Sequence, residues 1–94
     1  MTDIDWRHLP SLSALRAFEA TARLDGFSAA ARALNVTPAA VAQQVRGLET
    51  TLGLSLVERQ GRGLSLTPDG AKLAAALGEG FRRIAQGVDD LRWA

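Results

Sequence analysis

A glutamine and an arginine three residues apart, Gln43 and Arg46, carry the most informative chemistry in this sequence. They stand in the stretch "VTPAAVAQQVRGLE", residues 36–49. Side chains three apart share one face of a helix. A glutamine amide forms a bidentate pair with adenine, and an arginine reaches guanine or a phosphate. The stretch therefore indicates a helix that reads base edges, although a merely solvated polar face would contain the same residue types.

The residue types do not indicate a catalytic site. Ser28, Ser65 and Asp69 are the nearest approach to a hydrolytic set, but His8 is the only histidine and stands in the N-terminal segment. A serine nucleophile needs a base within hydrogen-bond reach. Cysteine is absent, which removes thiolate nucleophiles and thiolate metal ligands. We expect no enzymatic activity, no metal site and no cofactor.

Length and composition indicate one small domain. The chain has 94 residues, 47% of them hydrophobic, with a net charge of +1. A domain of this size gains only modest stability from its core and often relies on a partner. Residues 28–66 hold four arginines against two glutamates, so the middle of the chain is mildly basic, as a solvated face would also be. No apolar run reaches the ~18 residues of a membrane-spanning helix.

The elements that would position Gln43 and Arg46 are short helices. The first is expected to begin near Ser11 or Ser13, both good N-cap residues, and to end near Leu24, before the helix-breaking pair "DG". Ser28 is the predicted N-cap of a second helix that stops at Asn35. The alanines between them allow close helix crossing, as in a helix-turn-helix or in an ordinary helical hairpin.

Thr37 and Pro38 predict the start of the third helix, with threonine as N-cap and proline at the first helical position. We expect this helix to run to about Leu52, because Gly53 suits a left-handed stop. Its apolar residues recur at helical spacing on one face, and the other face is small or polar. Ala39 and Ala42 would contact thymine methyl groups if the helix entered a major groove.

A change of period after Gly53 predicts a β-hairpin. Its strands are expected at residues 56–59 and 64–67, with "QGRG" as the tip. Arg62, between two glycines, would lie along or in a minor groove, or would simply solubilise the turn. Arg59 is placed to contact a phosphate or to pair with an acid such as Glu49, which we expect to be a structural ion-pair partner.

A long last helix is predicted from Pro68 to about Trp93. Its apolar residues alternate four and three apart, the heptad spacing of paired helices: Leu77, Phe81, Ile84, Val88 and Leu91. The expected fold is therefore a mainly α winged helix-turn-helix with a two-stranded wing and a long C-terminal helix that forms a homodimer. A two-fold dimer would present two base-reading helices about one DNA turn, or a multiple of it, apart.

The chain resembles the DNA-binding region of LysR-type transcriptional regulators over about residues 9–91. The motifs Leu-x-x-Leu-x-x-Phe, Ser-x-x-Ala-Ala, Val-Thr-x-x-x-Val, Gln-x-Arg-x-Leu-Glu, Leu-Gly, Leu-Val-x-Arg and Leu-Thr-x-x-Gly carry this resemblance. The stretches "LPSLSALRAFEATAR" and "VTPAAVAQQVR" look most like the branch containing activators of glycine cleavage and regulators of inducible β-lactamase.

The resemblance implies a bacterial, cytoplasmic transcription factor, associated with the nucleoid when bound, whose partners are double-stranded DNA and a second copy. It places Pro38, Ala39, Ala42 and Gln43 at the bases. It places Ser28, Thr37, Arg46 and Arg59 at the DNA backbone, and Arg62 at the wing. Many family members have Ser at position 42 and Arg or His at position 43, so Ala42 and Gln43 leave the base preference open while the binding mode stays the same.

The domain boundaries follow from the same resemblance. Residues 9–67 are expected to form the winged domain, with the helix-turn-helix at about 27–46 and the wing at about 56–67. Residues 68–94 would form the linker and dimerisation helix. Family members continue into an effector-binding domain that this sequence does not contain, so a small-molecule effector would act only through that missing domain. We expect a DNA-binding fragment or a natural truncation. The alternative function is protein association: a winged helix used only to dimerise or to dock a protein.

Overall fold

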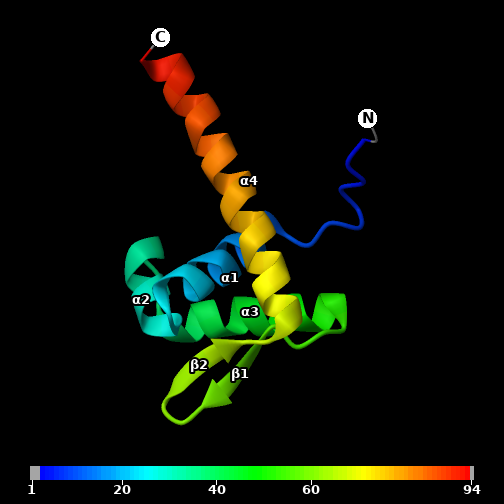
Figure 1. Ribbon diagram of the computed structural model, residues 1–94, viewed down its shortest axis with the longest axis vertical. Helices are drawn as coiled ribbons and strands as arrows, with labels where there is room; N and C mark the ends of the chain where they lie inside the picture. Colours follow the sequence, from blue (N-terminus) through cyan, green and yellow to red (C-terminus); the bar gives the residue numbers. More distant parts are fainter. Residues whose placement is uncertain (1–2, 94) are drawn as a thin grey trace.

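The computed structural model describes residues 3–93 and contains four α-helices and one β-hairpin. The predicted winged helix-turn-helix is confirmed (Figure 1). The elements follow the predicted order: α1 Leu12–Leu24, α2 Phe27–Leu34, α3 Pro38–Leu52, β1 Val57–Gln60, β2 Gly63–Leu66 and α4 Pro68–Arg92. Three residues lie outside the described part of the chain: Met1, Thr2 and Ala94. The predicted linker helix is expected to end at Ala94.

Three helix starts are capped by hydroxyl side chains. Ser11 Oγ accepts a hydrogen bond from the Ala14 N–H at 3.1 Å. Thr37 Oγ1 accepts from the Ala40 N–H at 3.1 Å, and Thr67 Oγ1 from the Gly70 N–H at 3.0 Å. Each bond satisfies a donor that the helix itself leaves unpaired. The predicted capping roles of Ser11 and Thr37 are confirmed.

The predicted N-cap role of Ser28 is wrong. The N-cap of α2 is Gly26, at φ 149°, and it makes no side-chain capping bond. Asp25 adopts the left-handed conformation at φ 62° and ends α1, so the chain turns into α2 directly afterwards. Ser28 therefore lies inside the first turn of α2 with its side chain exposed.

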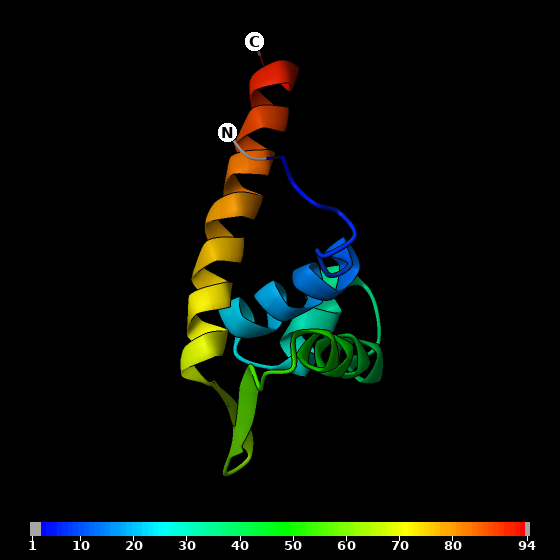
Figure 2. The same cartoon turned by 90° about the vertical axis from the view of Figure 1, so that its right-hand side faces the viewer.

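The core lies where the first three helices meet. Phe18, Ala30, Val41 and Val45 are at most 1% exposed, and Leu56, which precedes β1, is buried with them. The first half of α4 closes one side of this core through half-buried Leu73, Ala74, Leu77 and Phe81. Beyond that half, α4 extends away from the rest of the molecule (Figures 1 and 2).

The hairpin boundaries differ from the predicted ones. Val57 pairs with Leu66 and Gln60 with Gly63, so Leu56 and Thr67 lie outside the strands. Leu56 is instead buried in the core, and Thr67 caps α4. One backbone hydrogen bond, from the Thr67 N–H to the Leu56 carbonyl, still joins the two residues beyond the ends of the strands.

The base of the wing is fixed by hydrogen bonds to the segment before β1. Glu49 on α3 accepts from the N–H groups of Leu56 and Val57 at 2.8 and 3.3 Å. The Thr67 N–H donates to the Leu56 carbonyl at 3.0 Å. Glu49 is thus structural, as expected, but it bonds to backbone amides and not to an arginine. The hairpin is held at a set position relative to α3.

Gly70 lies where α4 passes closest to this segment. A Cβ at position 70 would lie 2.0 Å from the Leu56 carbonyl oxygen and 2.9 Å from its carbonyl carbon. Both atoms belong to backbone that is already held by Glu49 and Thr67. The closeness of this contact accounts for a glycine in the "LTPDG" motif.

Candidate nucleic-acid interface

The start of α3 presents its side chains to solvent. Pro38, Ala39, Gln43 and Arg46 are exposed, and Ala42 is half-buried. The opposite face of the helix supplies the buried Val41, Val45 and Leu48. One helix therefore divides into a face that packs and a face that is free to bind.

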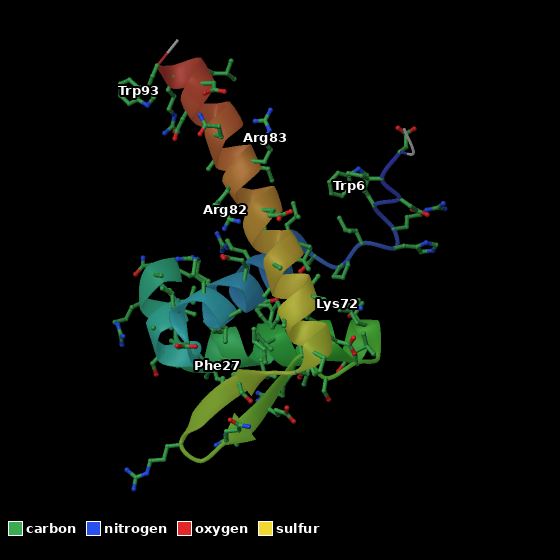
Figure 3. The ribbon with its side chains drawn as sticks, in the orientation of Figure 1. Trp6, Phe27, Lys72, Arg82, Arg83 and Trp93 are labelled. Carbon is green, nitrogen blue, oxygen red and sulfur yellow. The ribbon has the colours of Figure 1, made fainter. Side chains whose placement is uncertain are left out.

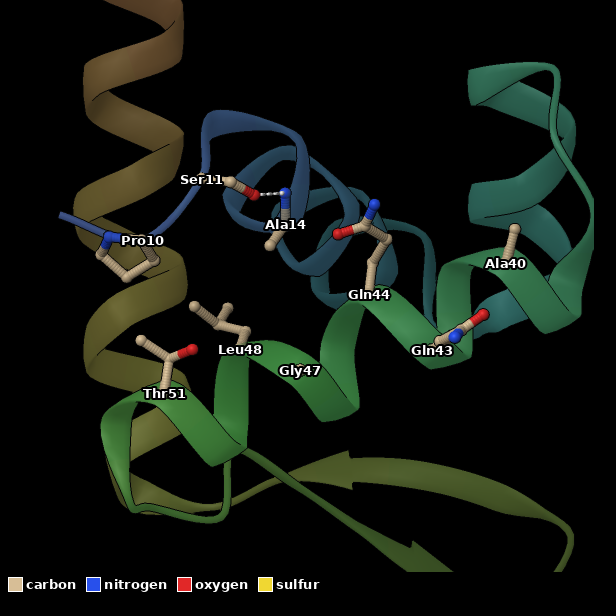
Figure 4. Close-up of a pocket in the computed structure, with 9 residues that line it drawn as sticks. All are labelled: Pro10, Ser11, Ala14, Ala40, Gln43, Gln44, Gly47, Leu48 and Thr51. Atoms are coloured by element: carbon tan, nitrogen blue, oxygen red, sulfur yellow. Dashed lines mark hydrogen bonds between the residues drawn. The ribbon is translucent and has the colours of Figure 1, made fainter.

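Gln43 and Gln44 point in different directions (Figure 4). Gln44 extends back toward the start of α1, where it also lines a small hollow with Ser13 and Arg16. Gln43 points away from α1 (Figure 4). Both glutamines are exposed and line the hollow between α1 and α3 that Figure 4 shows, but Gln44 alone also lines the smaller hollow beside Ser13 and Arg16.

A second feature is a hollow of about 400 Å³ between the start of α2 and the wing. Ser28, Arg59 and Arg62, three predicted site residues from distant parts of the sequence, line it together with Arg32. Asp25 is the one acid among its lining residues. The uncapped N–H groups of the first turn of α2 border the same hollow, and helix N-termini favour anions.

Arg32 is the functional candidate that the sequence did not single out. It stands four residues after Ser28 on α2, so the two share one helix face. The four-residue spacing along α2 is the signal in the sequence that could have placed Arg32 on the same helix face as Ser28. Its proximity to Arg59 and Arg62 depends on where the wing folds, which the sequence does not show.

The basic side chains of this surface are not neutralised by neighbours. Within residues 3–93, the ion pairs are Arg7 with Asp5, His8 with Asp5, and Arg23 with Glu19. None of them involves Arg32, Arg46, Arg59 or Arg62. These four guanidinium groups remain available to an external anion.

The predicted dimerisation residues divide into two groups along α4. Leu77 and Phe81 are half-buried against the core of their own chain. Ile84, Val88 and Leu91 are 62%, 43% and 85% exposed. The second group lies on the part of α4 that extends beyond the other helices (Figure 2), so an apolar stripe continues from the core onto an uncovered surface.

Comparison with known families identifies the class of protein. Residues 12–71 match the family described as "Bacterial regulatory helix-turn-helix protein, lysR family". The chain belongs to this family. It is a DNA-binding, transcription-regulatory helix-turn-helix domain and not an enzyme.

Two curated relatives and one solved structure illustrate the similarity. The chain is 59% identical over 92 residues to the AhcY transcriptional activator HvrB of Rhodobacter capsulatus, covering 98% of this chain and 32% of HvrB. It is 46% identical over 78 residues to the carbapenem-hydrolyzing β-lactamase transcriptional activator of Enterobacter cloacae, covering 83% of this chain and 26% of that protein. The BenM DNA-binding domain in complex with catB site 1 DNA superposes with a TM-score of 0.78 at 28% identity, covering 87% of this chain and 91% of that one.

The chain spans about a third or less of the curated relatives that it matches. Among the described residues, no helix is both long and apolar enough to cross a membrane. Residues 3–93 likewise contain no cluster of three or more histidine, cysteine or acidic side chains that could hold a metal ion.

Proposed function

We propose that this chain binds double-stranded DNA sequence-specifically, with α3 in the major groove and the wing at the minor groove. A second copy, paired through α4, would place two reading helices on a two-fold site. The observation that carries the proposal is that Ser28, Arg32, Arg59 and Arg62, from α2 and the wing, line one hollow. The same chain presents Ala39, Gln43 and Arg46 of α3 to solvent.

The reading role rests on the free face of α3. Ala39 and Ala42 are small enough for close approach and offer methyl groups to thymine. Gln43 has an amide that can pair with adenine in bidentate fashion. Pro38 begins the helix and would lie at the bases with Ala39, while Thr37, which caps the helix, would lie beside a phosphate at the groove edge. Arg46, one turn further along α3, would reach the backbone.

The anchoring role rests on the arginines of the hollow. Phosphate contacts fix the register of a protein on the duplex, while base contacts carry the specificity. Arg59 lies along the wing and Arg62 at its tip, where an arginine would enter the minor groove, whose potential attracts it. Ser28 and the first turn of α2 would bind the adjacent phosphate.

Dimer formation rests on the uncovered apolar stripe of α4. Residues 9–67 form the winged domain in this proposal, and residues 68–94 form the helix that dimerises. The first half of α4 also completes the core of its own chain, so the helix serves both roles. Ile84, Val88 and Leu91 then provide the contact between copies, with Leu77 and Phe81 at its edge.

The whole protein is proposed to be a bacterial, cytoplasmic transcriptional regulator that associates with the nucleoid through this domain. An effector-binding domain elsewhere in such a regulator would sense a small molecule. HvrB and the β-lactamase activator are named transcriptional activators, which supports this proposal because the present chain resembles their DNA-binding part.

Removing the wing arginine is expected to weaken binding to every sequence. Arg62→Ala should lower affinity and flatten the salt dependence, because loss of one phosphate-neutralising contact reduces the slope of log K against log salt by about 1. Fluorescence anisotropy with a labelled duplex at several salt concentrations measures both. Lys72→Ala, on α4 (Figure 3), is the control that removes a positive charge away from the wing. An unchanged slope of log K against log salt would show that Arg62 does not contact the DNA.

Gln43→Ala is expected to relax the base preference at one position of each half-site, at a cost of about 1–3 kcal/mol there. Gln44→Ala should leave the preference intact, since Gln44 is directed toward α1. Binding to duplexes substituted one base pair at a time measures the difference. If both variants kept the wild-type preference, Gln43 would not read a base.

The alternative function, a winged helix used only for protein association, predicts no salt-dependent DNA binding. The anisotropy titration of the wild-type chain therefore decides between the two. The four unpaired arginines of the surface favour DNA, because an apolar docking face would not require them.

A further inference from the structure

The chain between α3 and β1 turns around a single residue of α3, Glu49. The Glu49 backbone carbonyl accepts hydrogen bonds from the N–H groups of Gly53 and Leu54 at 2.8 and 3.2 Å. Its side-chain Oε2 accepts from the N–H groups of Leu56 and Val57 at 2.8 and 3.3 Å. Both the backbone and the side chain of one residue therefore hold the connection that leads into the wing.

The Glu49 carboxylate serves this connection and no ion pair. None of the ion pairs within residues 3–93 includes Glu49, and its side chain is half-buried. Leu56 is 1% exposed, so its amide has little water to bond to in place of this acceptor. A carboxylate is a stronger acceptor for a backbone amide than a neutral oxygen is. The start of β1 is thus fixed to α3 by one charged oxygen.

We propose that Glu49 is a positioning residue for DNA binding, whose carboxylate holds the wing where Arg59 and Arg62 reach the DNA while α3 lies in the major groove. The inference rests on the proposed function and adds to it the residue that joins the base-reading helix to the wing. Glu49 acts through the two arginines and does not itself contact the DNA.

The wing needs such an attachment because it is small. Its two strands have four residues each, and an isolated two-stranded hairpin is at best marginally stable. Strand β1 carries the tip roughly 10 Å beyond Val57. A small rotation at Val57 therefore becomes a large displacement of Arg62, which is exposed at the tip.

Strand alternation relates the position of Arg59 to that of Val57. Residues two apart on a strand face the same side. Val57 packs against the core, and Arg59 lines the hollow with Ser28 of α2, so both face the helices. Holding the amide of Val57 therefore also sets the direction in which Arg59 points.

Thr67 fixes the connection from the other end of the wing. Its Oγ1 donates to the Ser55 carbonyl at 2.6 Å, and its N–H donates to the Leu56 carbonyl at 3.0 Å. Neither bond reaches α3. In residues 3–93, the hydrogen bonds from the connection to α3 end on Glu49. Without the carboxylate, Leu56 stays in the core and the chain stays folded, but the wing loses its set direction relative to α3.

Two replacements of equal charge test the proposal. Glu49→Gln keeps an oxygen that can accept from both amides, and Glu49→Leu has no acceptor. Fluorescence anisotropy of the 94-residue chain with a labelled duplex at several salt concentrations would compare them, each with and without Arg62→Ala. In the Gln variant, Arg62→Ala should lower the slope of log K against log salt by about 1, as in the wild type. In the Leu variant the slope should already be lower by about 1–2, because each lost contact removes about 1, and Arg62→Ala should lower it no further.

The slope distinguishes positioning from a loss of stability. A chain that is only less folded binds more weakly at every salt concentration with an unchanged slope, because its folded fraction still makes all the contacts. Base preference is the second readout: Gln43→Ala should relax it equally in the Gln and Leu variants, since α3 still reads the bases. Circular dichroism verifies folding at the binding temperature. Glu49→Asp, one methylene shorter but still charged, takes the place of Glu49→Leu if that variant is unfolded, and it should show the same loss of the Arg62 effect.

The outcomes separate this inference from DNA binding itself. A wild-type chain without salt-dependent binding would overturn the proposed function and the inference with it. A wild type that binds, with equal slopes in Glu49→Gln and Glu49→Leu, would overturn the positioning role and leave DNA binding standing. A lower slope in Glu49→Leu alone, with the base preference kept, supports Glu49 as the residue that positions the wing.

Discussion

Gly70→Ala is expected to destabilise the fold by about 3 kcal/mol, a typical upper value for overpacking in a site that cannot relax. The added methyl group would lie 2.0 Å from the Leu56 carbonyl oxygen. That carbonyl accepts the Thr67 N–H, and the Leu56 N–H is held by Glu49. Either α4 or the base of the wing must move, and movement of either breaks those bonds.

Thermal unfolding followed by circular dichroism measures this effect. For a domain of this size, a loss of about 3 kcal/mol lowers Tm by roughly 12–24 °C. Gly47→Ala is the matched control, because a Cβ at Gly47 on α3 meets nothing within 4 Å. That change should raise stability by about 0.5–1 kcal/mol, the usual difference between glycine and alanine inside a helix. A Gly70→Ala variant as stable as the wild type would show that the close approach is not needed for folding.

Ile84→Asp is expected to abolish the dimer while preserving the folded monomer. Ile84 is 62% exposed, so a carboxylate there costs the isolated chain little. In the proposed pair, the same carboxylate would be buried against apolar side chains without a partner, which costs several kcal/mol. The dimer dissociation constant should rise by about a hundredfold or more, equivalent to ~2.7 kcal/mol.

Sedimentation equilibrium measures that shift, with Gln86→Asp as the control. Residue 86 is exposed and lies on the face of α4 opposite the apolar stripe, so the same new charge should leave the dimer largely intact. A dimer that persists in Ile84→Asp would place the interface elsewhere. Phe81→Asp would be a poorer test, because Phe81 also packs against the core of its own chain and the variant would lose stability.

The sequence predicts the helices well because their end signals are local. Thr37 followed by Pro38, and Thr67 followed by Pro68, specify a cap and a first helical residue whatever the rest of the chain does. The N-cap of α2 is predicted wrongly at Ser28 because that prediction, too, uses only the local sequence. A serine before an apolar run favours an N-cap, but Asp25 ends α1 and Gly26, two residues before Ser28, is the N-cap of α2.

The site is predictable only in part, because part of it depends on tertiary placement. Gln43 and Arg46 are recognisable from helical spacing alone. Arg32 becomes a candidate only once the wing brings Arg59 and Arg62 beside α2. Glu49 likewise suggests an ion pair in the sequence, whereas the folded chain gives it two backbone amides.

The central claim is sequence-specific reading of DNA by a dimer, and selection from a random duplex pool tests it most directly. The chain would be incubated with the pool at near-physiological salt, and the bound duplexes would be sequenced. We predict enrichment of a two-fold motif whose half-sites lie one or more helical turns apart. A pool that stays unenriched, at a concentration where sedimentation shows a dimer, would contradict the account and indicate that this winged helix binds something other than a DNA sequence.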